Sequence, residues 1–158
     1  MPMCFCVCNQ VQPDKVKEVI PSDFNFSFSF LFTRFNDYKV STFDSTYKTV
    51  VGDNDTVIKV VFTEEDKLKV YDTLMKYEYM KLPDTVINDP PCSMPEENDS
   101  LVVEANSKMK TIYLTGGPCR EPAKPVNQRF NSIRNTIMNI LFSKKEVERL
   151  PKSNRGAL

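Results

Sequence analysis

Histidine and tryptophan are both missing from this chain of 158 residues. The lack of histidine excludes Ser-His-Asp and Cys-His catalytic groups and zinc sites with histidine ligands. It also removes the commonest general base at neutral pH. The lack of tryptophan removes one common aromatic platform for sugars and cations. Chemistry based on carboxylates, lysine, tyrosine or an oxygen-held metal stays open, but the sequence carries no signature of it. We therefore expect no enzymatic activity, no catalytic or metal-ligating residues and no cofactor.

The chain also lacks an excess of charge and a long apolar run. Lys and Arg together number 21, as do Asp and Glu, so the formal net charge is +0. A balanced chain has no overall attraction for nucleic acid or an anionic membrane, so we expect a protein partner instead. No stretch approaches the roughly 20 apolar residues that a membrane-spanning helix needs, so membrane contact would require a lipid anchor. No pattern indicates an oligomeric state.

Size and composition are those of an ordinary globular domain. Hydrophobic residues make up 41% and charged residues 27% of the chain, close to average values. The length suits one domain and is too short for two ordinary ones. We expect a single domain over residues 23–158, preceded by a tether or truncated lipoprotein signal remnant over residues 1–22.

The first ten residues are apolar and rich in cysteine, and residues 11–18 are polar. A secretory signal needs a basic start and an apolar run of roughly 7–15 residues, but no Lys or Arg precedes the apolar run here. One interpretation is the end of a lipoprotein signal that begins upstream, with Cys8 or Cys6 as the lipidated first residue of the mature protein. The protein would then lie in the cell envelope, outside the cytoplasm.

Two other interpretations of this segment stay open. It is an ordinary terminus or edge strand of a cytoplasmic protein, or a thiolate metal site together with Cys92 and Cys119. The C-x-C-x-C spacing lacks the C-x₂₋₄-C pairs of structural zinc sites. Five cysteines cannot all pair within the chain. Cys92 and Cys119 would form a disulfide in an exported protein and would be thiols in the cytosol.

Alternation of apolar and polar residues predicts strands in the first third of the chain. Residues 24–32 carry a phenylalanine at every second position, which indicates a half-buried strand with its Phe face inward. Residues 38–43 and 46–51 continue the strand pattern. The turn composition of residues 52–55 joins 46–51 to residues 56–62, so these form a hairpin.

A second hairpin is expected later in the chain. Residues 101–105 and 109–114 have strand composition and flank the turn pair Asn106 and Ser107. Residues 84–100 contain three prolines among Asn, Asp and Glu, which predicts a loop.

Helical spacing appears in two segments. The first begins with Thr63 as the N-cap and with the acids of residues 64–66 in its first turn. Pro83 is expected to end it. Its apolar residues recur at helical spacing; they are Leu68, Tyr71, Leu74, Met75 and Leu82.

The second helix is expected over residues 127–149. Its apolar residues form one stripe, made of Phe130, Ile133, Ile137, Ile140 and Leu141. The polar residues are expected to lie largely outside that stripe; they are Arg129, Arg134, Asn135, Lys144 and Lys145. Together these patterns predict an α+β fold, with an antiparallel sheet built from hairpins and two amphipathic helices packed on one face.

Three local clusters could carry chemistry, but each has a structural interpretation that is favoured. Residues 53–55 offer oxygen ligands for a cation, yet they lack an EF-hand pattern and read better as a turn. Gly116 and Gly117 lack the rest of a phosphate-binding motif and read better as a loop leaving a strand. Cys119 lies beside Arg120, which would lower the pKa of its thiol, but no base accompanies it.

Several of these segments together resemble small bacterial lipoproteins of uncharacterised activity. The shared features are the Phe-rich first strand, the Thr63-Glu64-Glu65 helix start, the run Tyr71-Asp72-Thr73-Leu74-Met75, Leu82-Pro83, a strand pair and the final Glu148-Arg149-Leu150-Pro151. The resemblance spans about residues 24–158 and implies export and a lipid anchor, without a catalytic activity.

The leading functional hypothesis is a non-enzymatic, envelope-associated binding protein, anchored through a cysteine near the N-terminus. The alternative is a small immunity or inhibitor protein that binds and neutralises a partner toxin or enzyme, because that class also uses compact α+β domains without sites of their own.

Overall fold

The computed structural model describes residues 19–32, 36–51, 54–88, 91, 97–117 and 124–151. Cys6 and Cys8, the predicted lipidation sites, lie outside these residues, as do Cys92 and Cys119 of the predicted disulfide.

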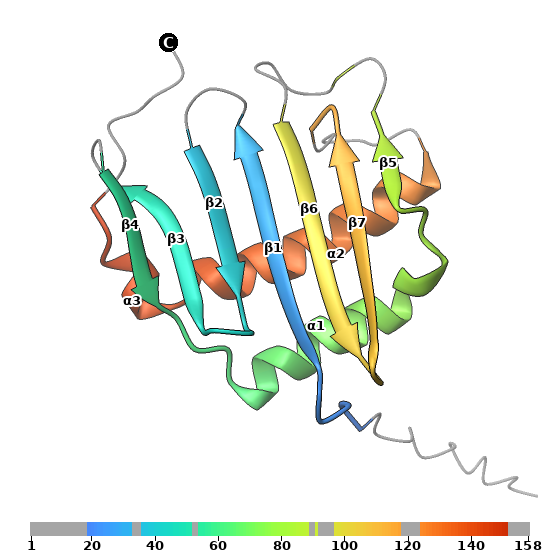
Figure 1. Cartoon of the computed structure of the whole chain (residues 1–158), viewed down its shortest axis with the longest axis horizontal. Coiled ribbons are helices and arrows are strands. Elements are labelled where there is room, and N and C mark those ends of the chain that lie inside the picture. Colours follow the sequence, from blue (N-terminus) through green and yellow to red (C-terminus); the bar gives the residue numbers. More distant parts are fainter. Residues whose placement is uncertain are drawn as a thin grey trace, which may run out of the picture.

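In the part of the chain that the structure describes, seven strands form one sheet in the order β4-β3-β2-β1-β6-β7-β5 (Figure 1). Neighbouring strands are antiparallel, except that β5 and β7 run parallel. The strands are β1 (Asn25–Phe32), β2 (Asn36–Ser41), β3 (Thr46–Val51), β4 (Asn54–Lys59), β5 (Thr85–Ile87), β6 (Glu97–Ala105) and β7 (Lys108–Thr115). The fold is α+β, as the sequence predicts.

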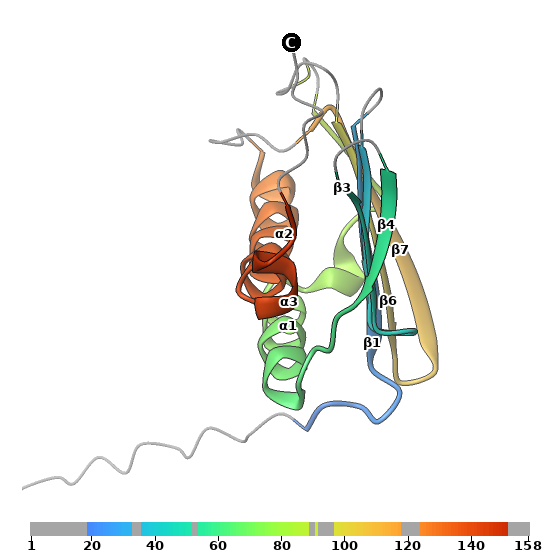
Figure 2. The same ribbon diagram turned by 90° about the vertical axis from the view of Figure 1, so that its left-hand side faces the viewer.

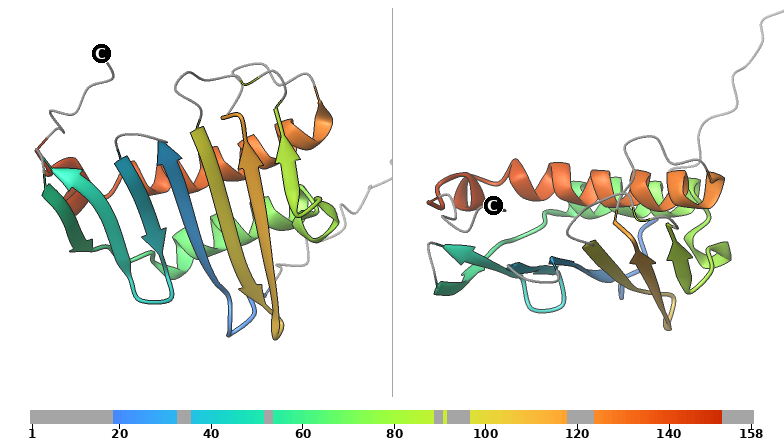
Figure 3. Two further views of the ribbon diagram at one scale, coloured as in Figure 1. Left: turned by 45° about the horizontal axis from the view of Figure 1, so that its top comes forward. Right: turned by 90° about the horizontal axis from the view of Figure 1, so that it is seen from above.

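The helices all cover one face of this sheet (Figures 2 and 3). They are α1 (Glu64–Lys76), the short 3₁₀ helix η1 (Tyr79–Lys81), α2 (Pro125–Phe142) and the single turn α3 (Lys145–Glu148). Helices α1 and α2 pack against each other as well as on the sheet. None of the helices in the described residues is long and apolar enough to cross a membrane.

Strand β1 is the middle of the sheet and supplies most of its aromatic core. Four phenylalanines of the alternating row are buried; they are Phe24, which directly precedes the strand, and Phe26, Phe28 and Phe30 within it. Phe24 packs edge-on against Tyr71 of α1, with ring centroids 5.1 Å apart, and Phe26 does the same against Phe62 at 5.2 Å. The expected inward-facing row is therefore confirmed for these four residues.

The second hairpin also forms as expected, with β6 and β7 joined at Asn106 and Ser107. Both turn residues have positive φ, at 53° and 57°, which matches the right-handed twist of a tight hairpin. Their backbone N–H groups donate to the carboxylate of Asp23 at 3.0 and 2.6 Å. The bond from Ser107 is the main reason why the pKa of Asp23 lies below its usual value. The side chain thus fastens the turn to the residues that precede β1.

The first helix ends earlier than the sequence predicts. It begins at the expected Thr63 cap but stops at Lys76, well before Pro83. Glu78 has a left-handed backbone, with φ of 50°, and this ends the helical path. Arg129 of α2 donates two hydrogen bonds to the carbonyl oxygen of Tyr77, from Nε at 2.9 Å and from Nη2 at 2.6 Å. The end of α1 is thus capped by a side chain from another helix.

Two further segment predictions are wrong in their boundaries. Residues 84–100 were expected to be a loop, but they contain β5 and the first residues of β6. Strand β5 is only three residues long and is held in the sheet by its parallel pairing with β7. The composition of residues 84–100 gives no indication of this pairing. The single helix expected over 127–149 is two helices, because Ser143 caps α2 and Lys144 is extended. That break turns α3 so that Val147 is buried.

The break between α2 and α3 places Lys144 beside the start of α1. Its ammonium group forms an ion pair with Asp66, and it lies 5.4 Å above the ring of Phe62. Asp66 also accepts hydrogen bonds from the backbone N–H and hydroxyl of Thr63, at 2.8 and 2.7 Å, in a capping box. Partial burial raises the pKa of Asp66, but the hydrogen bonds from Lys144 and Thr63 outweigh it, and the pKa is lowered.

We expect Asp66→Asn to lower the free energy of unfolding by about 1–2 kcal/mol at neutral pH, because it weakens a cap and an ion pair together. Folding lowers the pKa of Asp66 below 3.8, so its contribution is present above that value and is lost as pH falls through the folded value. The stability difference between the two proteins should therefore shrink in acid, as measured by urea unfolding across a pH series.

The control for this variant is Glu65→Gln, which removes an exposed ion pair with Lys69 in the same helical turn. It should change stability by no more than about 0.5 kcal/mol. A loss in Asp66→Asn that stays constant into acid would contradict the role given to the carboxylate.

Candidate functional site

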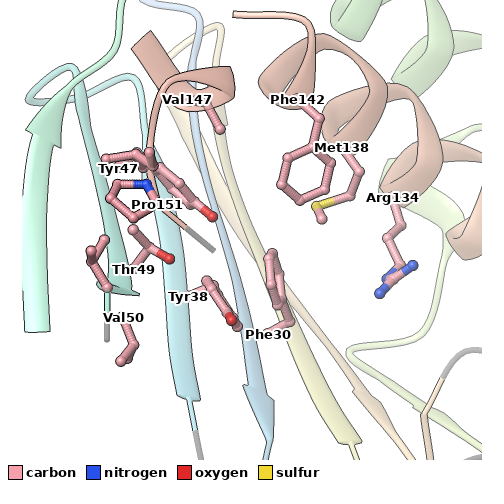
Figure 4. Close-up of a pocket in the computed structure, with 12 residues that line it drawn as sticks. Phe30, Tyr38, Tyr47, Thr49, Val50, Arg134, Met138, Phe142, Val147 and Pro151 are labelled. Atoms are coloured by element: carbon pink, nitrogen blue, oxygen red, sulfur yellow. The ribbon is translucent and has the colours of Figure 1, made fainter. Parts of the chain in front are cut away.

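A pocket of about 400 Å³ lies between the sheet and the C-terminal half of α2 (Figure 4). We call it the sheet–helix pocket. Its lining comes from β1, β2, β3, α2, α3 and the residues after α3; it comprises Phe30, Tyr38, Tyr47, Thr49, Val50, Val51, Arg134, Met138, Phe142, Val147, Leu150 and Pro151.

The two walls of the pocket have different origins. On the sheet side, the ring of Phe30 stacks on Tyr38 with centroids 4.8 Å apart. On the helix side, Met138 and Phe142 lie one turn apart on α2, and Phe142 is 54% exposed. Phe142 therefore lies both in the pocket wall and at the protein surface, so the pocket opens to solvent beside it.

Among the described residues that line the pocket, one is charged, and it is Arg134. Its Nε–H donates to Oδ2 of Asp99 in β6 at 2.9 Å. The side chain of Asp99 is 0% exposed and that of Arg134 is 18% exposed. A carboxylate this deeply buried needs a cation, and the pair places a guanidinium between the packed core and the open pocket. The bond uses one of the five N–H donors of a guanidinium.

Sheet register explains why Asp99 points toward the helices. It lies opposite Phe30 of β1 and Leu114 of β7, both of which are buried on the helix-facing side. In its own strand it is in phase with the buried Leu101 and Val103. An acid therefore occupies a position where the strand pattern calls for an apolar residue.

The sequence contained a signal for both members of this pair. Extending the alternation of β6 toward its N-terminus puts Asp99 on the inner face, but the segment was assigned to a loop. Arg134 was expected to lie largely outside the apolar stripe of α2. Its spacing of four from Phe130 and three from Ile137 instead puts it within the stripe, and the structure shows it only 18% exposed.

Tyr47 adds a second polar group to the pocket wall. Burial raises the pKa of its hydroxyl above the ordinary value of 10, and a hydrogen bond with Thr49 acts in the opposite direction with less effect. The hydroxyl is therefore protonated at neutral pH and can donate a hydrogen bond. Arg134, Tyr47 and Thr49 together give the pocket several donors.

A buried polar link holds the start of α2 on the sheet. Asn127 donates through its side-chain amide to Oδ1 of Asn88, at the end of β5, and Asn88 donates to the carbonyl oxygen of Gly117. Both asparagines are buried. Gly116 lies against this link: it has φ of 85°, and a Cβ there would lie 2.2 Å from the carbonyl oxygen of Asn88. A left-handed backbone without a side chain is required at this point.

The described residues of the clusters considered in the sequence are not among those that line the pocket. Of residues 53–55, Asn54 and Asp55 begin β4, and Gly116 and Gly117 follow β7 with positive φ. Cys119 and Arg120 lie outside the described residues. Within the described parts of the chain, no three His, Cys, Asp or Glu side chains are grouped so as to hold a metal ion.

Comparison of the chain with models of protein families and with curated proteins gives no match.

We expect Arg134→Met to lower the free energy of unfolding by about 3–5 kcal/mol, because it removes the guanidinium from the buried carboxylate of Asp99. The double variant Asp99→Asn with Arg134→Gln removes both charges of the pair and should stay within about 2 kcal/mol of the parent. Urea unfolding of the three proteins measures both differences.

A matched control neutralises the exposed pair of Lys48 and Asp55, which are 3.2 Å apart. The variant Lys48→Gln with Asp55→Asn should change stability by less than about 1 kcal/mol. If the Asp99 and Arg134 double variant were as unstable as Arg134→Met, the buried charge would not be the cause of the loss.

Proposed function

We propose that this chain is a non-enzymatic, envelope-associated binding protein and that the sheet–helix pocket receives its ligand. The observation that carries the proposal is the pocket itself: about 400 Å³, lined mainly by apolar side chains, with one guanidinium in its wall. Ligand sites in proteins have volumes of roughly 300–1,000 Å³ and combine apolar walls with a few placed polar groups.

The chemistry of the lining supports binding over catalysis. Among the described residues that line it, the ionisable side chains are Arg134, Tyr38 and Tyr47, and none is a carboxylate, a lysine or a cysteine. Arginine stays protonated in proteins, and burial keeps the Tyr47 hydroxyl protonated too. Acid–base catalysis needs a group that both gives and takes a proton near neutral pH, and neither of these residues does.

We expect Met138→Trp to fill the pocket and to weaken binding of N-phenylnaphthylamine, a neutral dye that fluoresces in apolar sites, by at least about tenfold. Met138 is half-buried in the helix wall of the pocket, so a larger ring there occupies the space that a ligand would take. Dye titration with fluorescence detection measures the change.

Met109→Trp is the matched control, because Met109 is 64% exposed on the other face of the sheet. It should bind the dye as the parent does, and circular dichroism should show both variants folded. Equal binding by the parent and Met138→Trp would place the dye elsewhere and count against the pocket.

The location is the second part of the proposal. We place the protein in the cell envelope, held by acyl chains on Cys8 or Cys6. Support comes from the cysteine-rich start, the polar segment after it, and the resemblance of residues 24–158 to small lipoproteins.

A second candidate function is that of an immunity or inhibitor protein, and the outer face of the sheet favours it. Ile87, Met109 and Tyr113 are each more than half exposed there. Val86 precedes Ile87 in β5, and Leu114 follows Tyr113 in β7; both Val86 and Leu114 are buried in the core. Because side chains alternate along a strand, Ile87 and Tyr113 project away from the helices, and so does Met109, four residues before Tyr113. Exposed aromatic and methionine side chains are typical of protein interfaces.

One measurement separates the two locations and the two functions. Intact and native mass spectra would be recorded on protein isolated from the membrane and soluble fractions of its host. We expect a membrane form that begins at Cys8 or Cys6 and carries acyl chains. A soluble form that begins at Met1, with five free thiols and a stoichiometric protein partner, would overturn the anchor and favour the inhibitor.

A further inference from the structure

We infer that the ligand of the sheet–helix pocket is an aliphatic monocarboxylate, a medium-chain fatty acid or a molecule with the same head and tail. The inference rests on the proposed function and specifies the ligand. Its carboxylate would meet Arg134, and its chain would lie along Phe30, Met138 and Phe142.

The polar groups of the pocket select an acceptor. A guanidinium has five N–H donors and no acceptor, and the protonated hydroxyl of Tyr47 can donate as well. No acidic side chain is among the lining residues that the structure describes. A carboxylate only accepts, and its two oxygens match the fork geometry of arginine. An amine would find no carboxylate in this lining.

The charge of Asp99 favours a ligand with a single negative charge. The carboxylate of Asp99 lies behind Arg134 and is bonded to its Nε at 2.9 Å. An anion bound to the other N–H groups of Arg134 would therefore have this carboxylate close by. Asp99 repels a dianionic phosphate more strongly than a monoanion, so the geometry favours a carboxylate.

The remaining lining selects an aliphatic tail. Beyond Arg134 the walls are the stacked rings of Phe30 and Tyr38 on one side and Met138, Phe142 and Val147 on the other (Figure 4). Methionine adapts its shape to unbranched chains, and the exposed Phe142 offers apolar surface at the opening. Burial of each added methylene should strengthen binding by about fourfold until the pocket is full.

The test compares decanoate with decanamide, a neutral molecule of nearly the same shape, by displacement of N-phenylnaphthylamine at neutral pH. The parent protein should bind decanoate about 10 to 100 times more tightly than decanamide, because the bond to arginine is charge-assisted. Octanoate should bind more weakly than decanoate.

The double variant Asp99→Asn with Arg134→Gln should lose the preference for decanoate and keep its affinity for decanamide. Lys48→Gln with Asp55→Asn, which neutralises an exposed pair, should keep the preference. If the first double variant does not fold, Arg134→Lys serves instead: it keeps the charge, loses the fork, and should reduce the preference while decanamide binding stays constant.

Different failures have different meanings. Equal binding of decanoate and decanamide by the parent would overturn the carboxylate inference but leave a binding protein. A preference that survives in the double variant would show that Arg134 does not hold the head group, and would also overturn it. No binding of the dye or of either amphiphile would overturn the proposed function itself.

Discussion

The row of phenylalanines on β1 is the constraint on which the rest of the fold depends. Because the row alternates with Asn25, Ser27 and Ser29, only one face of the central strand can enter a core. Both long helices must therefore pack on that face, which is the arrangement an antiparallel sheet with one open side allows (Figure 2). Helix α1 and Phe62, which precedes the Thr63 cap, supply rings to the start of the row, where Phe24 meets Tyr71 and Phe26 meets Phe62. At the end of the row Phe30 stacks on Tyr38 of the neighbouring strand instead, and the pocket opens there.

The buried ion pair of Asp99 and Arg134 lies where the packed core meets the pocket, and packing alone does not explain it. Apolar side chains of similar volume at Asp99 and Arg134 would fill the space at least as stably, because two charges would no longer be removed from water. The pair therefore contributes little to the reason why the chain folds. Its position, with the carboxylate fully buried and the guanidinium at a pocket wall, supports a role toward a ligand.

Features with local causes could be predicted from the sequence, and features caused by distant contacts could not. The Thr63 cap, the turn at Asn106 and Ser107, the Phe row and the apolar stripe of α2 each depend on residues within a few positions. The end of α1 depends on Arg129 from another helix, and β5 exists only through its pairing with β7. The pairing of Asp99 with Arg134 could not be predicted for the same reason, because it forms only when α2 packs on the sheet.

The pocket is held in shape by contacts at both ends of α2. At its start, Asn127 is bonded to Asn88 and through it to Gly117. At its end, Lys144 is paired with Asp66 at the cap of α1. A helix is stiff over this length, so fixing both ends fixes the height of Arg134 and Met138 above the sheet without direct contact with either anchor. A ligand would then meet walls that are already in place, and little of the binding free energy would be lost in ordering them.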